Sequence, residues 1–149
     1  MAEKAISLRQ RALGFLARRE YSRLELKRKL APHAENEEEV ENLLEDFQKR
    51  GWLSEDRYTE QLIHARRAKY GTQRIVQELR EKGVGEEAIS AALPELKDSE
   101  LETAKAVWVK KFGQPPVDAK DKARQVRFLA SRGFRMDVIF RVLGGGDED

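Results

Sequence analysis

Apolar side chains recur along the chain every three or four positions, the spacing that gathers them on one face of an α-helix. The clearest stripe consists of Val40, Leu43, Leu44 and Phe47. The alternation of apolar and polar residues that is typical of a half-buried strand is almost absent. The pattern therefore predicts an all-α protein. Its helices are expected at residues 5–19, 22–31, 36–50, 54–69, 72–82, 86–93, 99–112, 118–132 and 136–143.

Residues at the predicted helix ends fit these boundaries. Ser22 and Glu25 have the spacing of a capping box, in which each side chain accepts a hydrogen bond from a backbone N–H that the helix leaves free. Ser99 and Glu102 repeat this spacing, and Asn36 precedes three glutamates that suit the positive end of a helix. The predicted stops carry glycine, which readily takes the left-handed conformation that closes a helix. These glycines are Gly51, Gly83, Gly113 and Gly133.

The predicted helices fall into three sets of three. In each set an aromatic residue stands between the first helix and the second, namely Tyr21, Tyr70 and Phe112. A helical repeat of roughly 40–50 residues indicates similar units that bury part of their surface against their neighbours. We expect an elongated array, although short helices of this number could also form one globule. The expected modules are residues 1–53, 54–96 and 97–143, followed by an acidic disordered tail at 144–149.

Charge is distributed in blocks along the chain. The 29 Lys and Arg nearly balance the 27 Asp and Glu, so the net charge is only +2. The basic residues nevertheless concentrate in residues 1–34, 61–84 and 105–143, which alternate with acidic segments. Such blocks can create strong local potentials on a protein of almost neutral total charge. The composition is therefore compatible with a polyanionic partner.

Composition and motifs exclude several classes of function. The absence of cysteine excludes disulfide scaffolds, cysteine-based metal sites and a cysteine nucleophile. The chain has no phosphate-binding glycine loop, nucleophile elbow or zinc-protease motif. We therefore expect no enzyme, no cofactor and no metal site. No uncharged run is long enough to span a membrane, and the first residues lack the apolar core of a signal peptide, so we expect a cytoplasmic protein.

The middle of the chain carries its most distinctive motif. It runs through Gly51–Tyr58 (Gly-Trp-Leu-Ser-Glu-Asp-Arg-Tyr), Ala65–Gly71 (Ala-Arg-Arg-Ala-Lys-Tyr-Gly) and Arg74–Val84 (Arg-Ile-Val-Gln-Glu-Leu-Arg-Glu-Lys-Gly-Val). This pattern resembles the RecX family of regulatory proteins, which act on RecA recombinase. Ser54 is a mild departure, because the family pattern has an acidic residue there. The flanking units resemble the family more weakly, and together the resemblance covers nearly the whole chain.

The resemblance to the RecX family implies both a fold and a function. The fold is three tandem three-helix, helix-turn-helix-like modules in an elongated, curved array. The function is that of a monomeric, non-enzymatic regulator that binds RecA in the groove of its filaments, as well as single-stranded and double-stranded DNA. Such a regulator inhibits the recombinase, ATPase and SOS coprotease activities of RecA. A second hypothesis is a sequence-dependent DNA-binding protein that uses one module as a helix-turn-helix.

Basic side chains are the candidate binding residues. Lys120, Arg124 and Arg127 fall on one face of a predicted helix, where they could neutralise phosphates. Alternatively, basic residues near helix ends complement the helix dipole without binding anything. The aromatic residues at the helix junctions could stack on bases, but their repeated position favours a structural role. The full set of candidates for contact with DNA or RecA is Arg23, Lys27, Arg66, Arg67, Lys69, Arg74, Lys120, Arg124, Arg127 and Arg132.

Overall fold

The computed structural model describes residues 5–144, and these residues form eight α-helices, one short 3₁₀-helix and no strand. The all-α prediction is confirmed for this part of the chain. The predicted acidic tail lies outside it, apart from Gly144. In chain order the elements are α1 (Leu8–Arg18), α2 (Arg23–Leu30), η1 (Ala31–His33), α3 (Glu37–Lys49), α4 (Glu55–Arg66), α5 (Thr72–Glu81), α6 (Glu86–Lys111), α7 (Ala119–Ser131) and α8 (Met136–Val142).

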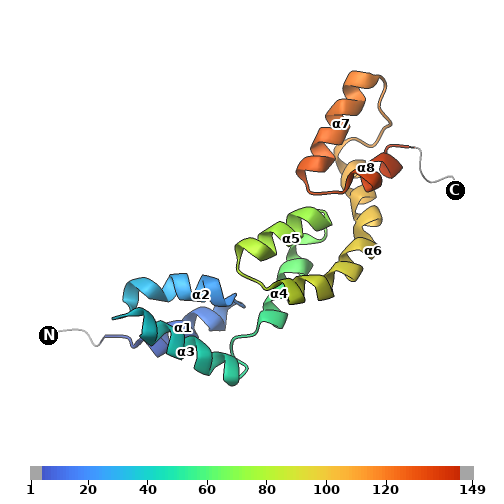
Figure 1. The fold of residues 1–149 in the computed structure, drawn as a ribbon. Helices are drawn as coiled ribbons and strands as arrows, with labels where there is room; N and C mark the ends of the chain where they lie inside the picture. Colours follow the sequence, from blue (N-terminus) through green and yellow to red (C-terminus); the bar gives the residue numbers. More distant parts are fainter. Residues whose placement is uncertain (1–4, 145–149) are drawn as a thin grey trace.

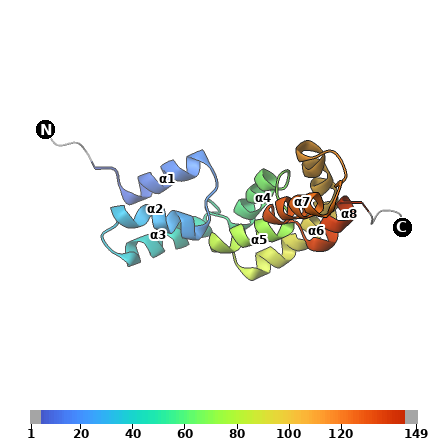
Figure 2. The same ribbon diagram turned by 90° about the horizontal axis from the view of Figure 1, so that it is seen from above.

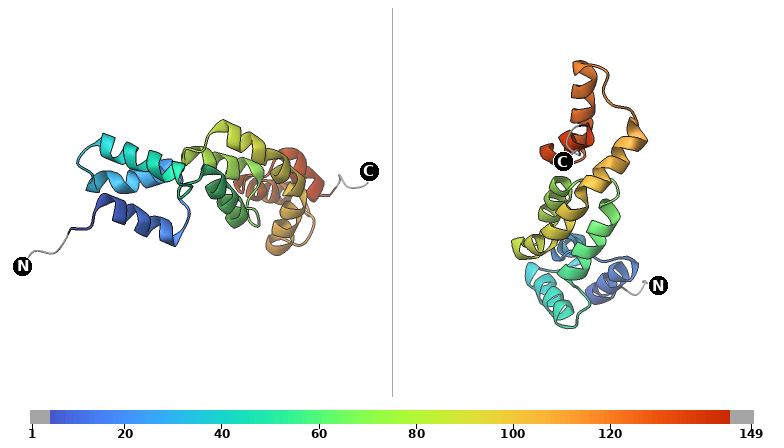
Figure 3. Two further views of the ribbon diagram at one scale, coloured as in Figure 1. Left: turned by 90° about the horizontal axis from the view of Figure 1, so that it is seen from below. Right: turned by 90° about the vertical axis from the view of Figure 1, so that its right-hand side faces the viewer.

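The helices follow one another along a curved line instead of folding back into one globule. Figure 1 shows α1–α3 at one end, α4, α5 and the first part of α6 in the middle, and the rest of α6 with α7 and α8 at the other end. Seen from above, the same order runs from one terminus to the other (Figure 2). The left-hand view of Figure 3, from below, shows α1 and α8 at opposite ends of the array. The prediction of an elongated, curved array is confirmed.

Three separate apolar cores hold the array together. The core of the first module forms between α1, α2 and α3, that of the second between α4, α5 and the first part of α6, and that of the third between the end of α6, α7 and α8. Each core is centred on fully buried side chains, which in the three modules include Leu26 and Phe47, Ile75 and Leu79, and Leu129 and Phe134. Each module therefore buries its own apolar stripes.

Local sequence signals place most helix ends. The Ser22 hydroxyl oxygen accepts the Glu25 N–H at 3.1 Å, and the Glu25 carboxylate accepts the Ser22 N–H at 3.1 Å. The Asn36 side chain accepts the Glu39 N–H in the same way at the start of α3. The four glycines at predicted stops all have positive φ, between 73° and 88°. The capping box, the asparagine cap and these stops are thus confirmed.

One long helix, α6, occupies the region where the sequence predicts two helices and a break. The expected break is wrong, because α6 continues through Pro94 without interruption. The Ser99 hydroxyl donates to the carbonyl of Glu95 and so does not cap a new helix. Pro94 removes one backbone hydrogen bond of the helix. The burial of Leu96 in the second core and Ala104 in the third accounts for its continuation, since one rigid helix serves both modules.

The joint between the first and second modules is polar. Arg57 Nε donates to Glu20 Oε2 at 2.8 Å, and Lys82 Nζ lies 3.4 Å from Glu25 Oε2. Burial alone would raise the pKa of Glu25, but hydrogen bonds from the Ser22 N–H and from Arg19 outweigh it and hold this pKa below its usual value. Ion pairs therefore contribute much of the contact between these two modules.

The joint between the second and third modules uses backbone hydrogen bonds. The Gly71 N–H donates to the carbonyl of Arg132 at 2.8 Å, and the Gln73 N–H donates to the carbonyl of Gly133 at 3.1 Å. This pairing brings the start of α5 against the end of α7. Because both partners are main-chain groups, the two modules meet at a distance that leaves no room for side chains between them.

A buried carboxylate completes the same joint. Glu100, in the middle of α6, is only 2% exposed. It accepts hydrogen bonds from the Thr72 hydroxyl at 2.8 Å, from the Arg135 N–H at 2.8 Å and from Arg135 Nε at 2.9 Å. One side chain of α6 thus links the first residue of α5 to the residue that precedes α8. The second joint therefore combines backbone hydrogen bonds with a buried carboxylate, whereas the ion pairs named at the first joint are partly exposed.

Candidate functional site

Two of the ten predicted binding residues, Arg23 and Lys27, are engaged inside the first module. Both lie on α2 and pair with Glu41 of α3, at 2.5 Å for Arg23 and 2.8 Å for Lys27. The hydrogen bond to Glu41 raises the pKa of Lys27, and the hydrogen bonds from Lys27 and Arg23 lower the pKa of Glu41. Glu41 therefore neutralises one of their two positive charges within the protein.

Three further predicted residues also have carboxylate partners. Arg66 forms a two-pronged contact with Glu78, with Nε at 2.9 Å and Nη2 at 2.8 Å from the two carboxylate oxygens. Arg67 lies 2.9 Å from Glu95, a residue of α6. Arg124, in the expected row on α7, donates to Asp121 at 2.8 Å. In each of these three residues a carboxylate already occupies part of the guanidinium group and competes with a phosphate for it.

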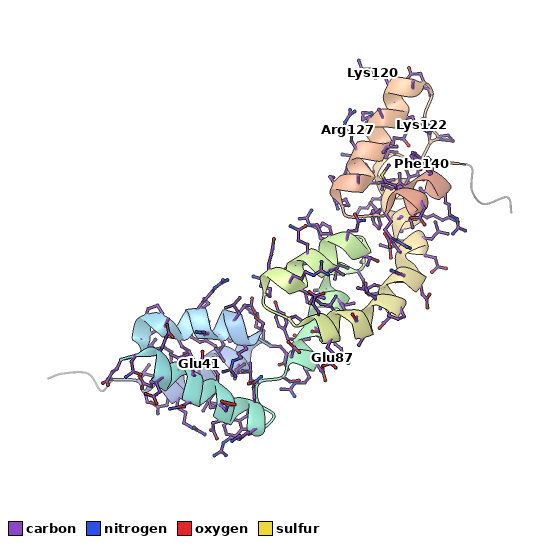
Figure 4. The ribbon with its side chains drawn as sticks, viewed as in Figure 1. Glu41, Glu87, Lys120, Lys122, Arg127 and Phe140 are labelled. Atoms are coloured by element: carbon purple, nitrogen blue, oxygen red, sulfur yellow. The ribbon has the colours of Figure 1, made fainter. Side chains whose placement is uncertain are left out.

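The other five predicted residues form no ion pair within residues 5–144, and all of them lie on the second and third modules. They are Lys69, Arg74, Lys120, Arg127 and Arg132. Lys120 and Arg127 project from the exposed face of α7, well away from Glu41 in the first module (Figure 4). Among the ten predicted residues, those without a carboxylate partner in the described part of the chain thus all lie on the second and third modules.

Aromatic rings hold several of the unpaired cations in place across the second joint. The guanidinium carbon of Arg74 lies 4.4 Å from the centre of the Tyr70 ring, and that of Arg132 lies 5.5 Å from the same ring. Arg132 also lies 4.8 Å from the ring of Phe128. A ring attracts a cation without cancelling its charge. Tyr70 and Phe128 therefore orient two guanidinium groups that stay available to an anion.

The sequence analysis missed two lysines that complete this cluster. Lys110 and Lys111 end α6, and Lys111 Nζ lies 5.2 Å from the centre of the Phe128 ring. Together with Lys69 and Arg132 they line a cleft of about 560 Å³ between the second and third modules. The signal available in the sequence is the Lys-Lys pair immediately before the Phe112 junction, but only the fold shows that it faces Arg132.

The cleft and the row on α7 form one continuous surface. Arg124 lies 4.9 Å from the centre of the Phe112 ring, and this ring meets Phe128 edge-on at 5.5 Å. Because Arg124 and Phe128 are four residues apart on α7, they stand on neighbouring turns of one face. The structure therefore brings together Lys69, Arg74, Lys120, Arg124, Arg127 and Arg132, and it places Arg23 and Lys27 apart in the first module.

Comparison with protein families identifies the three modules. Family models for the first, second and third three-helix domains of RecX match residues 9–47, 54–93 and 98–143. The chain belongs to the RecX family. It is 45% identical to the regulatory protein RecX of Ralstonia pickettii (strain 12J) over 148 residues, which are 99% of this chain and 93% of that protein. It is 50% identical to the regulatory protein RecX of Leptothrix cholodnii over 144 residues, which are 97% of this chain and 92% of that protein.

Solved structures of RecX proteins share the fold. A crystal structure of RecX from Lactobacillus salivarius superimposes with a TM-score of 0.77 at 15% identity, over 91% of this chain and 92% of that one. A second crystal structure of a regulatory protein RecX gives a TM-score of 0.79 at 23% identity, over 91% of this chain and 70% of that one. Membership of the RecX family makes this protein a regulator, with the modulation of RecA as the general role.

Two further expectations concern catalysis and membrane-spanning helices. The RecX family is a family of regulatory proteins, which agrees with the expectation that the chain is not an enzyme. Among the helices of residues 5–144, none combines the length and the apolar character that crossing a bilayer requires.

Proposed function

We propose that this protein binds RecA and RecA filaments on single-stranded DNA and inhibits the recombinase, ATPase and SOS coprotease activities of RecA. The observation that carries the proposal is the match of all three modules, in order, to the three RecX domains. The extended shape supports it, because an elongated array can lie along the groove of a helical filament and contact several neighbouring subunits (Figure 1). The protein acts as a monomer in the cytoplasm.

Contact with DNA is the second part of the proposal. The basic surface on the second and third modules neutralises phosphates of single-stranded DNA and, more weakly, of double-stranded DNA. Support comes from the cations of α7 and the second joint that have no carboxylate partner within residues 5–144. Such binding depends strongly on salt and little on base sequence. The paired residues Arg23, Lys27, Arg66 and Arg67 contribute to contacts with RecA or to the fold.

The experiment that tests the proposed function is the DNA-dependent ATPase of RecA, measured with increasing amounts of this protein. We expect inhibition at substoichiometric to equimolar ratios, together with co-sedimentation of the protein with RecA filaments. A protein that neither inhibits the ATPase nor binds RecA at these ratios contradicts the proposal.

A sequence-specific helix-turn-helix protein is the competing function. A recognition helix needs side chains that are free to reach base edges. On α2 the basic residues Arg23 and Lys27 are instead paired with Glu41, which disfavours this role for these two side chains. Competition between duplexes of different sequence discriminates the two functions, because the proposed regulator binds all of them alike.

A further inference from the structure

The cleft between the second and third modules differs in charge from the other clefts of the molecule. It is lined by four cations, Lys69, Lys110, Lys111 and Arg132, and by no carboxylate. Four other clefts of 370–560 Å³ in the described residues each include at least one carboxylate among their lining residues. The volume of about 560 Å³ falls within the roughly 300–1,000 Å³ of small-ligand sites. The cleft is therefore suited to an anionic ligand.

The cations of this cleft converge without a counter-charge. Lys111 and Arg132 both lie over the ring of Phe128, at 5.2 Å and 4.8 Å from its centre. None of the four cations forms an ion pair within residues 5–144. Like charges that share one ring repel each other, and an anion placed between them removes this repulsion. The fold thus holds the cations in an arrangement that an anion stabilises.

The walls of the cleft also carry two half-buried aromatic rings, those of Tyr70 and Phe128. Base–aromatic stacking contributes about 1–3 kcal/mol per base in single-strand binding proteins and tolerates any base. A duplex keeps its bases stacked on each other and cannot present one to these rings. The combination of four cations with two rings therefore fits an unpaired nucleotide better than a paired one.

We infer that this cleft binds a phosphate ester of an unpaired nucleotide, with Lys110, Lys111 and Arg132 on the phosphate and Tyr70 and Phe128 beside the base. The inference rests on the proposed function, because it specifies where single-stranded DNA is held. The adjoining row on α7 makes a strand the natural source of the phosphate, since Arg124, which lies over the Phe112 ring that meets Phe128, connects the cleft to Lys120 and Arg127. A free nucleotide has the same chemistry and is distinguished experimentally.

The test compares two variants of the full chain that lose the same charge from the same helix. Lys110→Gln/Lys111→Gln removes two cations from the cleft, whereas Lys97→Gln/Lys105→Gln removes two exposed cations of α6 that neither line it nor form ion pairs within the described residues. Binding of a fluorescent oligothymidylate is measured by anisotropy over a range of salt concentrations. Thermal melting by circular dichroism verifies that both variants fold.

The cleft variant is expected to bind more weakly and to show a flatter salt dependence than the control. Each phosphate of a single strand that the protein neutralises contributes about 0.7 to the slope of log affinity against log salt, so weakening the hold on the one phosphate in the cleft reduces the slope by up to about 0.7. Arg132→Gln, which removes one of the three cations on this phosphate, is expected to reduce the slope by less. Equal affinity and equal slope for the cleft variant and the control would overturn the inference.

Competitors identify the source of the phosphate. If a strand is the ligand, unlabelled oligothymidylate displaces the probe, while ATP and inorganic phosphate do not. If ATP displaces the probe from the wild type and does not bind to the cleft variant, the cleft is a phosphate site whose ligand is a free nucleotide. Inhibition of the RecA ATPase is measured on the same preparations. If the wild type inhibits RecA but the cleft variant binds DNA as the control does, the inference about the cleft is refuted and the proposed function stands.

Discussion

A methyl group at Gly71 would stand 2.4 Å from the carbonyl oxygen of Gly133, well inside van der Waals contact. The obstruction is reciprocal, because a methyl group at Gly133 would stand 2.3 Å from Cβ of Arg74. Gly133 also has a φ of +88°, which side chains disfavour. The two glycines allow α5 and α7 to approach until their backbones form hydrogen bonds, so the second and third modules behave as one body.

Gly71→Ala is therefore expected to destabilise this joint by about 1–3 kcal/mol, the usual range for an overpacked site. The clash is with backbone atoms, which cannot move aside as a flexible side chain can. Urea unfolding followed by the fluorescence of Trp108, in the third module, measures the effect once Trp52 is replaced by Phe in both proteins.

The matched control for Gly71→Ala is Gly14→Ala on α1. No atom lies within 4 Å of the added methyl group at Gly14, and the position is helical and exposed. Alanine is favoured over glycine in a helix by roughly 0.5–1 kcal/mol, so this variant is expected to be more stable than the wild type. A Gly71→Ala variant that is as stable as the wild type, or more stable, would contradict the close approach at the joint.

Glu100→Gln is expected to weaken the same joint by about 1.5–3 kcal/mol, because hydrogen bonds to a charged partner contribute about that much. The amide removes the negative charge that Arg135 faces and presents donor hydrogens to groups that are themselves donors. The control is Glu95→Gln, whose carboxylate is 67% exposed and pairs with Arg67 at the surface. Exposed pairs contribute less than about 1 kcal/mol. Equal losses in the two variants, measured by urea unfolding, would show that the buried position of Glu100 is unimportant.

The contacts of Glu25, at the edge of the first module that faces the second, are expected to weaken in acid. The pKa of Glu25 is held below its ordinary value of 4.5 by hydrogen bonds and by Arg19, which outweigh the opposing effect of burial. A carboxyl group with a lowered pKa in the folded state contributes stability in full above pH 4.5 and loses it as the pH falls through the folded-state pKa. Below pH 4.5 the free energy of unfolding should therefore fall less steeply in Glu25→Gln than in the wild type.

Glu60→Gln serves as the control for this pH dependence. Glu60 is exposed, lies on α4 and forms no ion pair within residues 5–144. Its substitution removes one carboxylate of the same kind and is expected to leave the slope of stability against pH as in the wild type. If the free energy of unfolding depends on pH with the same slope in Glu25→Gln and Glu60→Gln, the contacts of Glu25 do not cause the loss of stability in acid.

Local signals in the sequence were sufficient for most of the helix ends but not for the joints. A capping box acts over four residues, so the Ser22–Glu25 box is visible in the sequence and present in the fold. The same reasoning failed at Ser99, because the next residue, Glu100, is bound by Thr72 and Arg135 from other helices. These partners are distant in sequence, and their contribution to the continuity of α6 cannot be inferred from local spacing.

The candidate site shows the same division between local and distant information. The spacing of Lys120, Arg124 and Arg127 predicts a shared helix face, and all three side chains are exposed on α7. Which cations keep their charge available depends on distant carboxylates, as for Arg23 with Glu41. The convergence of Lys111 and Arg132 on the ring of Phe128 also requires the fold, since Lys111 ends α6 and Arg132 directly follows α7.

The cations of the α7 row should contribute unequally to DNA binding. Replacing Lys120, Arg124 and Arg127 together by Ala is expected to weaken oligonucleotide binding and to flatten its salt dependence, since each phosphate contact to a single strand contributes about 0.7 to the slope. Arg124 donates to Asp121 at 2.8 Å, and this contact lowers the pKa of Asp121. The carboxylate therefore offsets much of the positive charge of Arg124. Lys120 and Arg127 have no such partner within residues 5–144.

Lys120→Ala/Arg127→Ala should consequently reproduce most of the effect of the triple substitution, and Arg124→Ala alone should change the salt slope little. The discriminating companion is Asp121→Asn, which releases Arg124 from its carboxylate and is expected to strengthen oligonucleotide binding and steepen its salt dependence. Asp121 also accepts the Val117 N–H, so the fold of each variant is verified by circular dichroism. If the triple variant keeps the wild-type slope of log affinity against log salt, these three cations do not contact phosphates. If Asp121→Asn leaves binding unchanged while the double variant weakens it, Arg124 faces away from the strand.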